Sequence, residues 1–303
     1  MRDDGSYKCH FCDECDGHGC VGELPGMGGV YGNDNFIRNC ADWAEFARAP
    51  RDDSELPAVR LAPLTGAMQN VGYREERAFY HDLADSALAA GVRLSIGDGA
   101  PDEKLRFGIE ALAARSVRGA VFIKPYPNER VLERVEWARP VAEIVGVDID
   151  SYAIVTMRNQ VNLQRKTAAD LNEIKRHAAL PFAIKGIFRE SDLELVREVR
   201  PDVAVISNHG GRVETDRGST AAFLAAYGRE LRNHCGELWV DGGVRRRSDL
   251  ETAAFFGVSE VMVGRPFVTA LLRHGREGIA RALAALVARA GARAVAGSVP
   301  ERF

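Results

Sequence analysis

Residues 203–212 read VAVISNHGGR, and the pattern of this stretch recurs along the chain and indicates the fold. The apolar run 203–206 ends abruptly in Ser207, Asn208 and His209, and a glycine pair and Arg212 follow. A continuous apolar run is typical of a strand that is buried on both faces, as in a parallel sheet. The histidine and the arginine therefore stand where a buried strand ends, in a turn that is either a reactive site or only the closure of the strand.

The same pattern recurs from residue 57 onward: a short apolar run ends in glycine or polar residues, and a helical stretch follows. The eight runs are residues 58–62, 92–96, 120–124, 142–148, 182–186, 203–207, 238–242 and 260–264. Eight strand–helix units in roughly 250 residues favour an α/β fold of the (β/α)8 TIM-barrel type. An open doubly wound sheet is the alternative.

Two segments precede the predicted barrel. The stretch DNFIRNCADWAEFARAP (34–50) predicts a helix with an apolar stripe, which Asp34 or Asn35 can cap and Pro50 ends. Residues before it are rich in cysteine, glycine and aspartate and show little apolar periodicity. We therefore divide the chain into a Cys/Gly-rich segment, 1–32, and a unit of helix plus barrel, 33–303.

Composition narrows the class of protein. The net charge of −3 gives no electrostatic reason to expect a nucleic acid or a membrane surface as partner. No apolar run approaches the ~18 residues of a membrane span. The N-terminus, MRDDGSYKC, has no apolar signal core, so we expect a cytoplasmic protein.

A barrel should gather its chemistry at the carboxyl ends of its strands. Polar residues indeed follow each predicted strand, and their recurrence exceeds what turn chemistry alone explains. In chain order they are Thr65, Ser95, Asp98, Lys124, Tyr126, Asp148, Asp150, Lys185, Ser207, His209, Arg212, Asp241, Arg245 and Arg265.

The last two strands are followed by DGGVRRR (241–247) and GRP (264–266). Glycines there let backbone N–H groups approach a phosphate, and a following helix N-terminus adds a positive dipole. Arg245 and Arg265 can supply forked donors. Either piece alone is explained by a tight turn and solvated arginines, but the two together favour a phosphate-bearing ligand.

Lys185 and His209 are the two candidates for reactive groups. An ammonium inside the apolar strand 182–186 needs a partner, either a ligand at the barrel mouth or a structural ion pair with Asp148. Asp148 is also available to hold one ring nitrogen of His209, which would make the other nitrogen a better base. A lone histidine more often has a capping or core role.

Taken together, SNHGGR, DGGVRR and VGRPF resemble the FMN-dependent α-hydroxy acid dehydrogenase and oxidase family, which includes glycolate oxidase and flavin-type lactate dehydrogenases. LAPLTGAM (61–68) is similar to that family's first flavin-contacting strand, and AIKGI (183–187) to its strand with a flavin-facing lysine. The likeness extends over residues 33–285 and is most specific in the second half of the barrel.

The resemblance implies a set of cofactor contacts. Arg245 and Arg265, with Gly243 and Gly264, would hold the FMN phosphate. Lys185 would lie near the flavin N1–C2 carbonyl. Further cofactor contacts are expected from Thr65, Ser95, Lys124, Ser207 and Asp241.

It also implies a reaction. His209 would remove the hydroxyl proton of a small, carboxylate-bearing substrate while hydride passes to flavin N5. Asp148 would stabilise the imidazolium, Arg212 would clamp the carboxylate, and Tyr126 falls near the family's active-site tyrosine. A homo-oligomer, by resemblance a tetramer, is expected.

Several departures fall on the substrate side. The family's N-terminal tyrosine has no match in LPGMGG (24–29), and Lys124 stands where the family has a glutamine. The segment from Asp148 to Pro181 is short, and only Arg158 lies near the position of a second arginine. These differences predict an intact flavin site beside a remodelled substrate pocket.

The N-terminal segment carries KCHFCDECDGHGC, which the family does not normally have. Four thiolates at this spacing, Cys9, Cys12, Cys15 and Cys20, can surround a zinc ion or an iron–sulfur cluster. A tail with unrelated cysteines is the alternative.

Two other functions stay open at this point. One is a flavin-free barrel lyase or isomerase that binds a phosphate compound and uses Lys185 as a Schiff-base nucleophile. The other is a partner-dependent flavoprotein that acts on an unusual or peptide-linked substrate. The sequence identifies neither the substrate nor the electron acceptor.

Overall fold

The computed structural model describes residues 34–48, 55–67, 73, 75–154, 161–213 and 215–289. The Cys-rich segment and its predicted metal site lie outside these residues. Eight parallel strands form the centre: β1 (Ala58–Leu61), β2 (Ser95–Gly97), β3 (Gly119–Ile123), β4 (Ala142–Asp148), β5 (Phe182–Ile187), β6 (Val203–Ile206), β7 (Glu237–Asp241) and β8 (Glu260–Val263).

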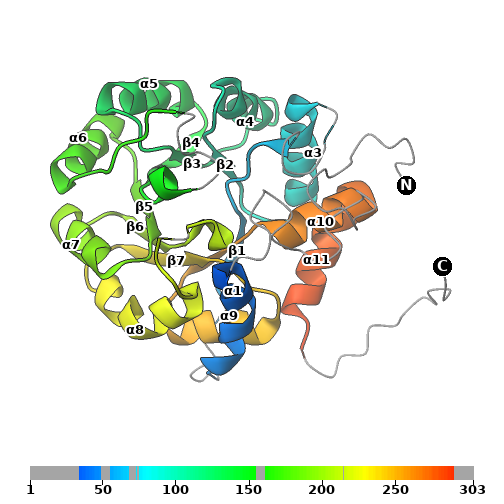
Figure 1. Cartoon of the computed structure of the whole chain (residues 1–303). Coiled ribbons are helices and arrows are strands. Elements are labelled where there is room, and N and C mark those ends of the chain that lie inside the picture. The colour runs from blue at the N-terminus through cyan, green and yellow to red at the C-terminus, as the bar shows by residue number, and fades with distance from the viewer. Residues whose placement is uncertain are drawn as a thin grey trace.

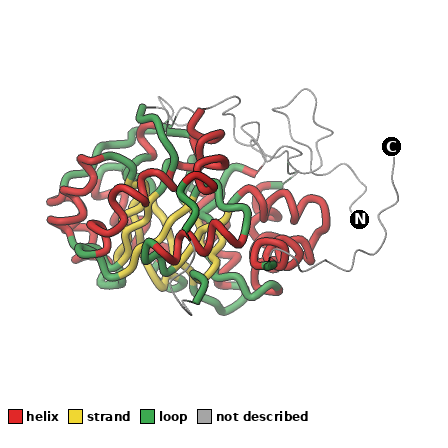
Figure 2. Tube along the Cα trace, turned by 90° about the horizontal axis from the view of Figure 1, so that it is seen from below, coloured by secondary structure: helices red, strands yellow, loops and turns green. Residues whose placement is uncertain are grey.

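The strands are ordered β1-β8-β7-β6-β5-β4-β3-β2, and a bridge between Arg60 and Arg93 joins the two ends. Leu61 N–H donates to the Arg93 carbonyl at 2.8 Å across this junction. The ring is thus closed, which confirms the predicted (β/α)8 barrel. Figure 1 looks down into the ring, and Figure 2 shows the strands enclosed by helices from the side.

The helices form the outer layer. They are α1 (Asp34–Glu45), α3 (Glu76–Ala89), α4 (Glu103–Ala113), α5 (Asn128–Ala138), α6 (Ala168–Ala178), α7 (Glu190–Val199), α8 (Thr220–Arg232), α9 (Arg247–Phe255), α10 (Arg265–His274) and α11 (Gly278–Val287). Short 3-10 turns are η1 (Ser151–Ala153), η2 (His209–Gly211) and η3 (Gly275–Glu277). Among the described residues, no helix has the length and apolar character needed to cross a membrane.

Strand alternation builds the barrel interior. Successive side chains of a strand point to opposite faces, so every second residue faces inward. Phe122, Val205, Trp239 and Met262 belong to the small inner cluster, and Gly146 makes room for it, because a Cβ there would lie 2.7 Å from the Phe122 ring.

Two residues further along, the inward positions of five of these strands are polar. They are Lys124 after β3, Asp148 on β4, Lys185 on β5, Ser207 after β6 and Asp241 on β7. All five are buried. A polar layer thus covers the small inner cluster at the carboxyl ends of the strands. The sequence predicted the reactive groups at this end of the barrel.

The opposite end of the barrel is closed by a buried arginine. Arg60 is only 2% exposed, donates to Glu260 at 2.5 Å and to Glu143 at 2.7 Å, and lies 4.7 Å over the Trp239 ring. This end therefore has a structural role.

Helix α1 packs against η2, α8 and α9 (Figure 1). Asn39 and Asn208 exchange side-chain hydrogen bonds of 2.7 and 3.1 Å, and Trp43 donates from Nε1 to the Gly242 carbonyl at 2.9 Å. The helix ends at Glu45, before the predicted end at Pro50. Asn35, one of the two predicted caps, instead donates to the carbonyl oxygens of residues 213 and 216.

Two glycines allow this close approach. A Cβ on Gly211 would lie 2.5 Å from the backbone nitrogen of Phe36, and one on Gly243 would lie 1.7 Å from the Asn39 carbonyl oxygen. Both glycines also have positive φ angles. The glycine pairs that follow β6 and β7 therefore serve the docking of α1 as well as the shape of the barrel mouth.

Candidate active site

A pocket opens at the carboxyl ends of β1 and β5–β8. Eight of the residues predicted from the sequence line it: Lys185, His209, Arg212, Asp241, Gly243, Arg245, Gly264 and Arg265. The fold thus brings together segments that lie far apart in the sequence, as the predicted barrel requires.

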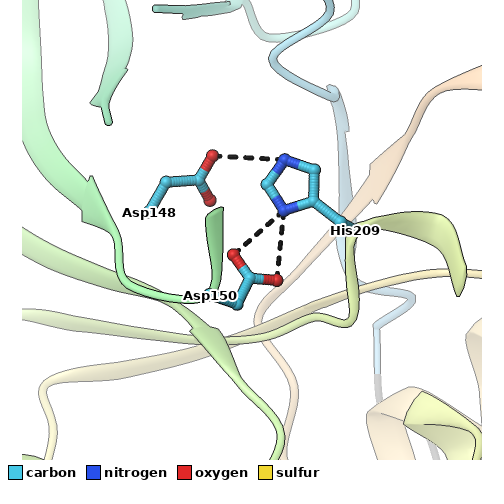
Figure 3. A group of neighbouring side chains, drawn as sticks. All are labelled: Asp148, Asp150 and His209. Atoms are coloured by element: carbon cyan, nitrogen blue, oxygen red, sulfur yellow. Dashed lines mark hydrogen bonds and ion pairs between the residues drawn. The ribbon is translucent and has the colours of Figure 1, made fainter. Parts of the chain in front are cut away.

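His209 begins the turn after β6 with a φ of +56°, a left-handed conformation that is uncommon for residues other than glycine. Its Nδ1 lies 2.9 and 3.1 Å from the two carboxylate oxygens of Asp150 (Figure 3). Because a carboxylate accepts only, this contact places the proton on Nδ1 and leaves Nε2 as the basic atom. The strained backbone is held in place by Asn208, whose Oδ1 accepts from Gly211 N–H at 3.0 Å.

Asp148, the predicted partner of His209, lies on the other side of the ring, with Oδ2 3.4 Å from Nε2 (Figure 3). Its closer contacts are with lysines: Oδ1 accepts from Lys185 and Oδ2 from Lys124, both at 3.1 Å. Burial alone would raise the pKa of Asp148, but the charge of His209 when it is protonated and the charges of Lys185 and Lys124 outweigh burial and lower it. Asp148 thus stays ionised and anchors both ammonium groups.

Lys185 is 2% exposed and also contacts Ser207 Oγ at 3.1 Å and Asp241 at 3.4 Å. Burial alone would lower the pKa of Lys185, but the surrounding carboxylates, Asp148 first, outweigh it and raise the pKa. Lys185 is therefore held as an ammonium ion that faces the pocket.

Lys124 is the second ammonium of the site and is 7% exposed. Its Nζ lies 2.9 Å from Ser151 Oγ and 3.3 Å from His209 Nε2, in addition to its contact with Asp148. The basic nitrogen of His209 thus lies between an ammonium and a carboxylate.

Three arginines surround the outer part of the pocket. Arg265 donates from Nη2 to the Gly210 carbonyl at 2.8 Å and lies 4.3 Å over the Phe36 ring. Arg212 is half-buried, and its burial lowers the pKa of the guanidinium to about 10. Arg245 begins the segment that leads into α9, where its N–H donates to Asp249.

Three predicted residues lie away from the His209 cluster. The ring of the buried Tyr126 lies 4.4 Å from the Arg134 guanidinium and 5.0 Å from that of Arg130, and its hydroxyl is buried with no hydrogen-bond partner in the described chain. Ser95 pairs in register with Ala120, deep in the barrel, and Thr65 lies beside Gly97 and Gly99. None of the three lines the pocket in the described part of the chain.

The residues at the pocket fit FMN by their chemistry. Asp241 Oδ1 is buried and has no hydrogen-bond partner within the described chain, so it is an acceptor waiting for a donor such as a flavin N–H or a ribityl hydroxyl. Lys185 supplies a fixed positive charge nearby. At the outer end, the N-terminus of α10 follows Gly264 and lies next to Arg245 and Arg265 on the same wall. Such a terminus with arginines suits a phosphate.

A metal ion is a poorer fit to the histidine cluster. Asp148, Asp150 and His209 can bring one ligand atom each within 4.8 Å of the others. Lys124 and Lys185 already neutralise Asp148, however, and a divalent cation there would be repelled by both ammonium groups.

Two contributors to the site were not assigned a role from the sequence. The sequence places Asp150 only at the end of its strand, and with two carboxylates two positions apart it does not show which of them holds Nδ1. Asn39 lies in the predicted α1 segment, yet its pairing with Asn208 joins residues 169 positions apart.

Comparison of the sequence with known protein families gives a match. A family model described as FMN-dependent dehydrogenase matches residues 114–290, more than half of the chain. A 2-hydroxyacid oxidase of Dictyostelium discoideum is 35% identical over 114 residues, covering 38% of this chain and 29% of the relative. An L-lactate dehydrogenase (cytochrome) of Saccharomyces cerevisiae is 36% identical over 122 residues, covering 39% and 20%.

Solved structures support the fold. A mandelate oxidase variant with (S)-mandelic acid superposes with a TM-score of 0.65 at 22% identity, over 86% of this chain and 84% of that one. The aligned part of this chain spans only about a fifth to a third of the length of the curated relatives.

Proposed function

This chain belongs to the family of FMN-dependent dehydrogenases, and from that premise we propose that it oxidises a 2-hydroxy acid, with His209 as the base. The observation that carries the proposal is the contact between His209 Nδ1 and both oxygens of Asp150, which leaves Nε2 as the proton acceptor at the mouth of the barrel. Relatives act on related compounds by name: 2-hydroxy acids, lactate and mandelate.

The proton chemistry belongs to His209 and two carboxylates. Nε2 takes the hydroxyl proton of the substrate, and the imidazolium that forms is stabilised by Asp150 at Nδ1 and by Asp148 at Nε2. The surrounding cluster holds two ammonium groups, Lys124 and Lys185, and three carboxylates: Asp148 and Asp241 pair with the lysines, and Asp150 contacts His209. The one net negative charge of this cluster is neutralised by the proton that His209 takes up.

FMN is the cofactor that we assign to the pocket. Bound there, it supplies an acceptor for the hydride that leaves the substrate carbon. Lys185 and Asp241 would hold the polar edge of the ring system, with Ser207 positioning Lys185. Arg245, Arg265, Gly243 and Gly264 would hold the phosphate.

The substrate is a carboxylate-bearing small molecule in this proposal. Arg212 lines the same pocket as His209, and a guanidinium there can bind a carboxylate through paired N–H donors. Tyr126, by contrast, is assigned no contact with the substrate, because its ring faces the arginines of α5.

The flavin-free lyase is disfavoured by the state of Lys185. A Schiff-base lysine must lose its proton to become a nucleophile. The ion pairs of Lys185 raise its pKa, so the ammonium form is stabilised. Borohydride trapping in the presence of substrate should therefore leave Lys185 unmodified.

Three further expectations remain part of the proposal. The cysteines at 9, 12, 15 and 20 would bind zinc or an iron–sulfur cluster as a unit separate from residues 33–303. The chain would form a homo-oligomer, a tetramer by resemblance, in the cytoplasm. Metal analysis, light scattering and cell fractionation test these expectations in turn.

The experiment that tests the function is anaerobic mixing of the FMN-loaded protein with a panel of 2-hydroxy acids. Loss of the oxidised-flavin absorbance with at least one acid is the expected result, and His209→Ala should abolish it while retaining FMN. Reduction that proceeds at the wild-type rate in His209→Ala would remove His209 from the role of base.

A further inference from the structure

We propose that Lys124 covers the basic nitrogen of His209 before substrate binds, and that its side chain then moves so that the ammonium group pairs with the carboxylate of the substrate. This inference rests on the proposed function. It identifies the carboxylate of the substrate as the group that draws Lys124 away from His209 Nε2. An acid would thus be accepted, and a neutral analogue of the same shape would be turned over poorly.

The first observation is the crowding of Nε2. Lys124 Nζ lies 3.3 Å from His209 Nε2, while Asp150 holds Nδ1 on the opposite side of the ring. Since Asp150 places the ring proton on Nδ1, Nε2 carries a lone pair, and Lys124 is positioned to donate to it. The position that a substrate hydroxyl must take is therefore already filled by an N–H donor.

The second observation is that Asp148 does not depend on Lys124 for a counter-charge. Its other oxygen accepts from Lys185 at 3.1 Å, and Lys185 is at least as deeply buried. Lys124 can therefore leave Asp148 without stranding the carboxylate. The remaining partner of Lys124, Ser151 Oγ, is neutral and lies on the short η1 turn, so no second ion pair holds Lys124 in place.

The third observation concerns charge in the reacting state. When the substrate O–H bond breaks, its proton moves to Nε2, the C–H bond gives its electron pair as hydride to FMN, and a C=O bond forms. An ammonium 3.3 Å from the resulting imidazolium would oppose this step. A carboxylate next to the reacting carbon draws the ammonium away from Nε2 and neutralises it, so substrate binding and exposure of the base occur together.

A substrate oxygen within hydrogen-bonding distance of Nε2, about 3 Å, lies no more than about 6 Å from Lys124 Nζ. A carboxylate attached to the carbon that bears this oxygen is therefore within reach of the flexible lysine side chain. Lys124 becomes a second cation for the substrate beside Arg212.

The test uses the full-length, FMN-loaded protein and the variants Lys124→Met, Lys124→Gln and Lys124→Arg. Lys166→Met is the matched control, since Lys166 is 4% exposed and bonds to Asn128, away from His209. FMN content and circular dichroism establish that each variant is folded. Two measurements follow: binding of oxalate, an unreactive anion, by calorimetry, and anaerobic flavin reduction by mandelate and by its neutral amide.

We expect Lys124→Met and Lys124→Gln to weaken oxalate binding by about 10- to 100-fold, the usual effect of losing a hydrogen bond to a charged group. The rate preference for the acid over the amide should shrink by a similar factor, because the base is uncovered in both cases. Lys124→Arg should retain most of the oxalate affinity, and Lys166→Met should match the wild type.

Unchanged oxalate affinity in Lys124→Met and Lys124→Gln, or an unchanged acid-to-amide ratio, would overturn the proposal. Failure of the parent function looks different. In that case no 2-hydroxy acid reduces the wild-type flavin, whereas oxalate still binds in a manner that depends on Lys124. Absence of oxalate binding to the wild type would also overturn the role of Lys124.

Discussion

Replacing Asp150 by asparagine should slow flavin reduction strongly while leaving the protein folded and loaded with FMN. The carboxylate contacts His209 Nδ1 through both oxygens, at 2.9 and 3.1 Å. Asparagine keeps the size of the side chain and a carbonyl that can still accept from Nδ1–H. What is lost is the negative charge that stabilises the imidazolium after proton transfer.

The size of the effect follows from Coulomb's law. Two unit charges about 4 Å apart at an effective dielectric constant of about 20 interact by about 4 kcal/mol. Since each 1.36 kcal/mol of barrier is a factor of ten, the rate of flavin reduction should fall by up to about 10³-fold. Asp148, 3.4 Å from Nε2, compensates in part and sets this figure as an upper limit.

The assay is stopped-flow reduction under anaerobic conditions with saturating substrate. Asp192→Asn is the matched control: Asp192 has the same 7% exposure as Asp150 but accepts from backbone N–H groups of residues 188 and 189. The control should reduce its flavin at the wild-type rate. A rate for Asp150→Asn within about threefold of the wild type would refute the assignment of Asp150 as the partner of His209.

Three further substitutions and one labelling experiment have distinct expected outcomes. Gly186→Ala should slow flavin reduction without removing any reactive group, because a Cβ there would lie 2.5 Å from Asp150 Oδ1; stopped-flow on the folded variant checks this. Asn39→Leu should cost about 1–3 kcal/mol of unfolding free energy by orphaning the Asn208 amide, measured by urea titration. Arg60→Met should lower Tm without changing FMN affinity, because it removes one of the two arginines paired with the buried Glu260; since Arg93 remains, the cost should stay below the about 3–5 kcal/mol of a fully stranded charge. Burial raises the pKa of Cys235 to about 11, so at pH 8 about one thiol in a thousand is ionised, and iodoacetamide should label Cys235 far more slowly in the native protein than after denaturation; equally rapid labelling of Cys235 in both states, located by peptide mapping, would contradict the raised pKa.

Much of the barrel was predictable from apolar runs. The run 142–148 coincides with β4, and six others agree with their strands to within one residue at either end. The run 92–96 is the exception, because β2 begins only at Ser95. Val92 and Leu94 are buried in the main core cluster, so apolar character there reflects packing outside a regular strand.

The positions of the mouth residues were predictable, but their partners were not. Alternation along a strand points Asp148 and Lys185 inward, and their register pairing places them side by side. Asp150 and Tyr126 lie beyond the strand ends, where turn geometry decides the direction of each side chain. After β3 a tight turn, with Tyr126 N–H donating to the Lys124 carbonyl at 2.8 Å, directs the tyrosine ring to the arginines of α5.

The role of α1 required the three-dimensional structure. The amphipathic pattern predicted the helix but gave no sign that its amides hold the loop with His209. That contact depends on two glycines that lack a Cβ at the point of closest approach. From the sequence, Gly243 was interpreted as leaving room for a phosphate, and part of that room is occupied by α1.

The central claim is that His209, polarised by Asp150, removes a proton from a 2-hydroxy acid in an FMN-loaded barrel. Anaerobic titration of the FMN-loaded wild type and of His209→Ala with 2-hydroxy acids tests it most directly. The account predicts that the wild-type flavin is bleached in a single turnover and that His209→Ala keeps its FMN and stays oxidised. A wild-type protein that binds FMN but is reduced by no 2-hydroxy acid, or a His209→Ala variant reduced equally fast, would contradict it.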